Sequence, residues 1–245
     1  RAASTQTGMH VVTTLLAAHA IPPEYQDDRQ GYVDLVCQTL IPQVAKEQLA
    51  DAVDAFCEGI GFSADETREI FAAAARWDLP VKLHADQLSD LGGAGLVAEF
   101  GGLSADHVEY TSTNSIRAMG ESDTVATLLP YAYYALQETQ KPPIEAFRKH
   151  GVDMAIATDC NPGTAPTTNL LQCLHMACTQ FGLTVEEAIR GVTINAAKAL
   201  GLDNQKGSLE VGKDAEVVLW NTTEVADLVY WQGGKQVKQI ITAQV

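Results

Sequence analysis

The sequence predicts an α/β protein whose parallel strands form most of a (β/α)8, TIM-like barrel. Short runs rich in Val, Ile, Leu and Ala alternate with stretches of helical character, which is typical of βα units around a parallel sheet. The strand-like runs are almost continuously apolar, as expected of strands that are buried on both faces. Six such units follow one another within ~150 residues, which favours a barrel.

These patterns also place the individual elements. Two capping boxes, in which a Ser or Thr and a Glu three residues later cap the first turn, mark helix starts at Ser63 and Thr184. Helices are expected near 29–50, 64–77, 91–100, 113–119 and 143–150, and strands at 11–16, 53–57, 81–84, 105–110, 124–129 and 154–158.

The chain changes character after Asp159. Residues 167–202 have the pattern of two helices, and the residues beyond them have that of short strands with a turn at Gly233-Gly234. We therefore expect two parts: a partial barrel at 1–202, and at 203–245 a small appended β element that belongs to a β-sandwich.

Composition and charge exclude several classes of partner. The chain has 245 residues, of which 46% are hydrophobic and 19% charged, so it can bury a substantial core. Its 16 basic and 31 acidic residues give a net charge of −15, which repels nucleic acid and anionic membrane surfaces. No apolar run is long enough for a membrane helix. The five cysteines form no CxxC pair and are odd in number, which predicts a reducing, cytoplasmic location.

Chemically useful side chains gather where the predicted strands end. His19, His84, His107 and Asp159 each follow or close an apolar run. In a barrel these positions face one mouth, where the reactive residues lie. Imidazole and carboxylate groups together are the donor set for a divalent metal ion, which lowers the pKa of its water to ~7. Any one of these residues alone is more simply explained as a hydrogen-bonded structural residue, but four at matching strand ends favour a site.

The loop after the last predicted strand is also polar. Asn161 offers a side-chain amide, Gly163 allows close backbone approach, and Thr164 adds a hydroxyl. A polar or anionic ligand can bind such a loop, although Asn, Pro and Gly are equally typical of an ordinary turn. The local sequence leaves both interpretations open.

Several motifs carry a family resemblance. Residues 84–89 (HADQLS), 104–110 (SADHVEY) and 157–164 (ATDCNPGT) resemble the metal-dependent amidohydrolase superfamily and, within it, the imidazolonepropionases. The resemblance implies a TIM-like amidohydrolase barrel. It also implies hydrolysis of the cyclic amide of 4-imidazolone-5-propanoate to N-formimidoyl-L-glutamate, a step of histidine degradation.

The resemblance implies roles for individual residues. His84 becomes a metal ligand, Asp159 both a ligand and the proton acceptor, and His107 a catalytic histidine close to the metal. One divalent ion, zinc or iron, is implied, since the run 11–19 lacks the Lys that bridges two metals in binuclear relatives. A homodimer is expected. The implied substrate contacts are His19, Gln87, Asn161, Gly163 and Thr164.

The sequence also departs from the superfamily pattern. No His-x-His pair occurs in these residues, although the superfamily's first barrel strand ends in one. The Arg that binds the substrate carboxylate in the family is missing too. We therefore expect this chain to be the C-terminal portion of a longer enzyme, and to be inactive alone.

Three other functions compete with this hypothesis. Residues 93–98 (GAGLVA) match a dinucleotide-binding fingerprint, which would indicate an NAD-dependent oxidoreductase. That fingerprint should follow a strand directly, whereas residues 87–90 intervene here. A nucleobase deaminase is the nearest alternative within the superfamily. A non-catalytic subunit is the third, and metal analysis with a hydrolase assay separates them.

Overall fold

The computed structural model describes residue 6 and residues 8–242, and the chain divides into two compact units, Arg1–Thr124 and Val125–Val245. The predicted boundary between 202 and 203 is a different division and stays a prediction. No helix among the described residues has the length and apolar character needed to cross a membrane.

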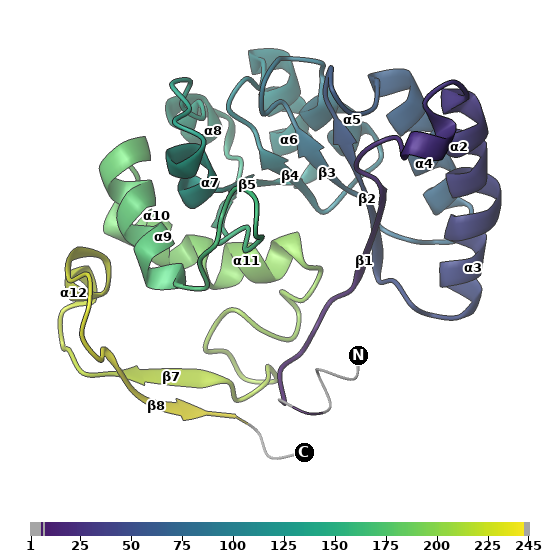
Figure 1. The fold of residues 1–245 in the computed structure, drawn as a ribbon. Coiled ribbons are helices and arrows are strands. Elements are labelled where there is room, and N and C mark those ends of the chain that lie inside the picture. The colour runs from purple at the N-terminus through teal and green to yellow at the C-terminus, as the bar shows by residue number, and fades with distance from the viewer. Residues whose placement is uncertain (1–5, 7, 243–245) are drawn as a thin grey trace. The chain divides into compact units, whose positions relative to one another are not determined.

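The first unit is a parallel sheet covered by helices (Figure 1). Its strands lie in the order β1-β2-β3-β4. Each strand leads through a loop into a helical segment that returns to the next strand, as in βα units. The strands are β1 Thr14–Ala18, β2 Ala52–Cys57, β3 Lys82–Ala85 and β4 Ser104–His107. The helical segments are η1 Pro23–Tyr25, α2 Arg29–Leu35, η2 Val36–Leu40, α3 Ile41–Lys46, α4 Ala64–Ala75, α5 Gly93–Glu99 and α6 Thr113–Ser122.

The sequence explains why these helices begin where they do and which face they bury. Ser63 caps α4 and receives a reciprocal bond from Glu66, so the predicted capping box is confirmed. The side of α4 that carries Ile70 and Phe71 is buried and packs on β2. Helix α5 packs its small residues on β3, and α6 buries Ile116 and Met119. Helices α4 and α5 thereby cover β2 and β3 of this sheet.

The second unit contains two parallel strands, several helices and a two-stranded antiparallel sheet (Figure 1). The capping box at Thr184 is confirmed, with Glu187 as its partner. The strands are β5 Val125–Leu128, β6 Met154–Ile156, β7 Val217–Trp220 and β8 Val237–Ile241. The helical segments are α7 Pro130–Ala135, α8 Ile144–His150, α9 Leu170–Met176, η3 Ala177–Phe181, α10 Val185–Gly191, α11 Ile194–Ala199 and α12 Val225–Tyr230.

Three of the predictions for this unit need correction. Helix α7 was not expected, and residues 167–202 form a helix with a π-helical end followed by two short helices instead of two helices. The segment after 203 is not purely β, because α12 lies between β7 and β8. Tertiary contact explains α12, since it buries Leu228 and Val229 and packs against α9.

Candidate metal-dependent active site

Three of the predicted site residues lie together at the carboxyl ends of the first unit's strands. His19 follows β1, His84 lies within β3 and His107 closes β4. The ring centroid of His84 is 6.0 Å from that of His19 and 5.6 Å from that of His107. His19 also stacks on Phe56. In the β3–β4 register His84 lies opposite Asp106 and Ala85 lies opposite His107, so the two histidines are offset by one residue on neighbouring strands.

The ring of His84 pairs with a carboxylate that was not predicted from the sequence. Its Nδ1 lies 3.2 Å from Oδ1 and 3.1 Å from Oδ2 of Asp54, a buried residue of β2. Burial lowers the pKa of His84, but the charge and hydrogen bond of Asp54 outweigh burial and raise that pKa to about 9 in the metal-free protein. Asp54 therefore stabilises a proton on this ring.

A second carboxylate, Asp106, completes a polar cluster beside His84. Asp106 accepts a hydrogen bond from Ser104 Oγ at 2.7 Å and pairs with Lys82 Nζ at 3.1 Å. Burial raises the pKa of Asp106, but the charges of Lys82 and His84 lower it below its ordinary value. Asp54, His84 and Asp106 each offer one ligand atom within 4.8 Å of the others, so their chemistry fits a divalent cation.

His107 is placed to act as a neutral imidazole. The residue is only 5% exposed, and burial together with the charge of His84 lowers its pKa to about 3. Its backbone is left-handed, with φ of 81°, and that of the β-branched Val108 is too, with φ of 67°. Such conformations are costly for these residues and persist where the surroundings over-determine them, which is common at functional sites.

Two buried carboxylates fix the loops around these histidines. Asp86 accepts hydrogen bonds from Gly93 N at 3.0 Å, Ala94 N at 3.3 Å and Thr111 Oγ1 at 3.0 Å. It thereby joins the end of β3 to the start of α5 and to the loop after β4. This arrangement also argues against the dinucleotide fingerprint, because a carboxylate occupies the helix N-terminus where a pyrophosphate would bind.

Glu58, directly after β2, holds the loop that carries Gln87 through hydrogen bonds. Its carboxylate accepts bonds from Leu88 N at 2.8 Å, Ser89 N at 3.2 Å and Ser89 Oγ at 2.7 Å. Gln87 itself is half-buried, and its side chain makes no hydrogen bond to the part of the chain that the structure describes. Its role as a substrate contact stays a prediction.

The remaining predicted residues lie together in the loop after β6, in the second unit. Asp159 has a left-handed backbone, with φ of 52°. Asn161 Nδ2 donates to Asp159 O at 2.7 Å and to Thr164 Oγ1 at 2.9 Å, and Asn161 Oδ1 accepts from Gly163 N and Thr164 N at 2.8 Å each. Asn161 thus organises this loop, and its role as a substrate contact stays a prediction.

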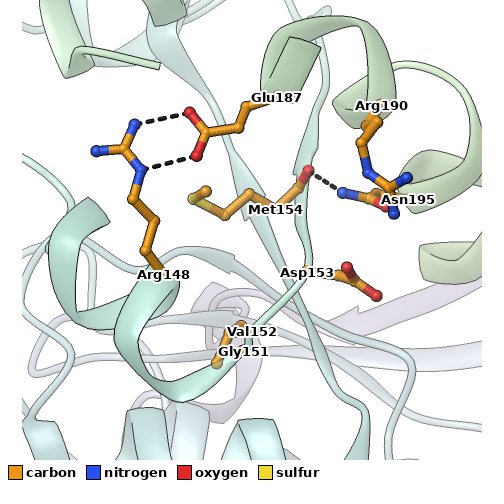
Figure 2. A pocket seen from close by; sticks show the side chains of 8 residues that line it. All are labelled: Arg148, Gly151, Val152, Asp153, Met154, Glu187, Arg190 and Asn195. Carbon is orange, nitrogen blue, oxygen red and sulfur yellow. Dashed lines mark hydrogen bonds and ion pairs between the residues drawn. The ribbon is translucent and has the colours of Figure 1, made fainter. Parts of the chain in front are cut away.

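The opposite end of β6 holds a cavity of about 200 Å³ that contains none of the predicted site residues. Figure 2 shows its wall, in which Arg148 pairs with both carboxylate oxygens of Glu187, and Asn195 donates to Met154 O at 2.9 Å. Barrel enzymes place their catalytic residues at the carboxyl ends of the strands. We therefore place the candidate site in the loops that follow the strands, and we assign no catalytic role to this cavity at the amino end of β6.

Sequence comparison agrees with the motif resemblance. The chain is 60% identical over 227 residues to an imidazolonepropionase of Maricaulis maris, 58% identical to that of Caulobacter vibrioides and 54% identical to that of Pseudomonas aeruginosa. These alignments cover 91–94% of this chain but only 56–58% of the relatives. The chain therefore spans little more than half the length of these curated relatives, and the predicted resemblance is confirmed.

Solved structures show the same fold at low identity. An adenosine deaminase from Xanthomonas campestris with bound zinc superposes with a TM-score of 0.75 at 19% identity, covering 99% of this chain and 61% of that one. Atrazine chlorohydrolase from Arthrobacter aurescens, complexed with zinc, gives 0.75 at 15% identity, covering 98% and 62%. The model of the Amidohydrolase family matches residues 2–243. This chain belongs to the amidohydrolase family, and its predicted amidohydrolase fold is confirmed.

Proposed function

We propose that the protein containing this chain is an imidazolonepropionase. It hydrolyses the ring amide of 4-imidazolone-5-propanoate to N-formimidoyl-L-glutamate, a step of histidine degradation. The observation that carries this proposal is the 54–60% identity to curated imidazolonepropionases over more than nine-tenths of the chain. The cluster of His19, His84 and His107 at adjacent strand ends supports it.

The proposed metal centre contains one divalent ion, zinc or iron, held by His84 and Asp159. Imidazole and carboxylate donors suit both metals. When bound, the ion supplies Lewis acidity and a lowered water pKa. The adenosine deaminase that shares this fold is a structure with bound zinc.

Residues of this chain have three roles in breaking the C–N bond: proton transfer, stabilisation of the carbonyl oxygen and binding of the ring. Asp159 takes the proton of the attacking water and passes it to the departing ring nitrogen. His107, neutral because burial depresses its pKa, donates a hydrogen bond to the carbonyl oxygen as negative charge develops there. His19, Gln87, Asn161, Gly163 and Thr164 hold the ring and its polar edges.

The proposed setting follows from the same resemblance. The enzyme acts in the cytoplasm as a homodimer on a small molecule, and not on nucleic acid or membranes. The substrate carries a negatively charged carboxylate, and this chain has a net charge of −15. A positively charged group near the bound carboxylate must therefore offset the negative potential of the protein.

The test is a direct assay of the complete protein. Freshly made imidazolonepropionate should lose its ring absorbance and yield N-formimidoylglutamate. His107→Ala should abolish most turnover, whereas His150→Ala, at the end of α8 and outside the site, should not. Ammonia release from guanine or cytosine, without turnover of imidazolonepropionate, would overturn the substrate assignment in favour of a nucleobase deaminase.

A further inference from the structure

Asp54 is a buried charge without an evident structural purpose. It lies within β2, where every residue is buried, and it is only 4% exposed. Its side-chain hydrogen bonds within the described chain go to His84 alone. Burying a carboxylate costs several kcal/mol unless it is paired, and an apolar side chain would serve a buried strand better. The carboxylate therefore points to a function that involves His84.

The geometry fixes which nitrogen of His84 carries a proton. An ionised carboxylate can only accept hydrogen bonds, so the imidazole nitrogen that faces it must be the donor. That nitrogen is Nδ1, at 3.1–3.2 Å from both Asp54 oxygens. A nitrogen that bears a proton in the ring plane has no lone pair for a metal. The other nitrogen, Nε2, makes no hydrogen bond to the described residues.

We propose that Asp54 is a positioning residue that holds His84 as the Nδ1–H tautomer and presents Nε2 to the metal. This inference rests on the proposed metal-dependent function. Carboxylates behind histidine ligands generally set the tautomer, the ring orientation and the basicity of the ligand. Phe56 supports the orientation from the side, with its ring edge-on to that of His84 at 6.3 Å.

The alternative is that Asp54, His84 and Asp106 bind the metal directly as one cluster. Two contacts argue against it. Both oxygens of Asp106 are already engaged, one by Ser104 Oγ and the other by Lys82 Nζ. A divalent ion bound there would also lie beside the Lys82 ammonium. The Lys82–Asp106 pair is instead balanced in charge, and the hydrogen bond of Asp54 goes to His84.

The experiment uses the complete protein and two measurements that do not depend on turnover. Ring-nitrogen NMR of the histidine-labelled, zinc-loaded protein should show His84 protonated at Nδ1 and bound through Nε2. Chelator competition should show that Asp54→Leu, which removes the acceptor, weakens zinc binding about 10- to 100-fold. Asp54→Asn keeps one acceptor oxygen and should fall between the wild type and Asp54→Leu.

A matched double variant tests the alternative. Lys82→Met with Asp106→Asn removes the neighbouring ion pair without changing the net charge, and zinc affinity should stay within about threefold of the wild type. Metal bound through Nδ1 overturns the proposal, as does zinc affinity unchanged in Asp54→Leu, or lost equally in the double variant. The NMR result needs only the wild type, so it decides even where a variant does not fold. A protein that binds zinc as described but leaves imidazolonepropionate intact would refute the proposed function alone.

Discussion

Removal of the Asp86 carboxylate should destabilise the first unit far more than its position in a loop suggests. Asp86 is fully buried and accepts three hydrogen bonds, from the amides of Gly93 and Ala94 and from the Thr111 hydroxyl. Asp86→Ala leaves three buried donors without an acceptor, each worth about 1–2 kcal/mol. Part of this loss is offset, because burial raises the pKa of Asp86 and so disfavours its charged form. We expect a net loss of about 3 kcal/mol in the free energy of unfolding.

The assay is urea unfolding followed by circular dichroism, together with amide hydrogen exchange at Gly93 and Ala94. Asp90→Ala is the matched control, because Asp90 lies in the same loop, is exposed, and accepts a single bond from Gly92 N at 3.1 Å. It should cost less than about 1 kcal/mol. Equal effects of the two substitutions, or unchanged exchange at the two amides, would refute this account of the loop.

Three further predictions follow from the site and the ion pairs. His107→Ala should lower kcat by about 100-fold or more while zinc content stays at the wild-type level; zinc loss equal to that of His84→Ala would make His107 a ligand. Glu58→Gln should speed amide hydrogen exchange at Leu88 and Ser89, because an amide group cannot accept all of the bonds that the carboxylate accepts. It should also raise KM, because the same loop carries Gln87. Exchange at the two amides as slow as in the wild type would contradict this. Glu187→Gln keeps the capping box but weakens the pairing with Arg148, whose hydrogen bonds hold the pKa of Glu187 at about 2. This stabilisation is present above the unfolded pKa near 4.5 and is lost as the pH falls through the folded pKa of about 2. The variant should therefore cost about 1 kcal/mol at pH 7, after solvent screening, and progressively less as the pH falls below 4.5. Glu186→Gln, an exposed residue on the same helix, is the control, and an equal cost at pH 7 would contradict the role of the Arg148 pair.

The fold was predictable wherever a segment's own residues decide its structure. Apolar runs located β1 to β6, although β1 spans Thr14–Ala18 instead of 11–16. The two helix starts at capping boxes were placed correctly because the box satisfies backbone donors locally. Helix α12 was missed because its Val, Leu and Tyr residues favour a strand, and only its packing against α9 makes it helical.

The candidate site was predictable only at the strand ends. The rule that barrel chemistry lies there identified His84 and His107. It could not identify Asp54 or Asp106, whose relation to His84 depends on the register between neighbouring strands. One signal was present in the sequence: Asp54 and Lys82 are charged residues at inward positions of apolar strands, which are rarely occupied by charge without a partner.

The loop contacts explain how this site tolerates its strained backbone. Left-handed conformations at His107 and Val108 cost about 1–3 kcal/mol each, so they require compensation nearby. Val108 N donates to Ala85 O at 3.0 Å and Tyr110 N to Asp86 O at 2.8 Å, while the Asp86 side chain holds Thr111. These bonds tie the strained turn to Ala85 and Asp86, the two residues that follow His84. The Asp86 carboxylate adds one side-chain bond, to Thr111, to the two backbone bonds that hold this turn. Its loss should therefore loosen the turn that carries His107 before it unfolds the sheet.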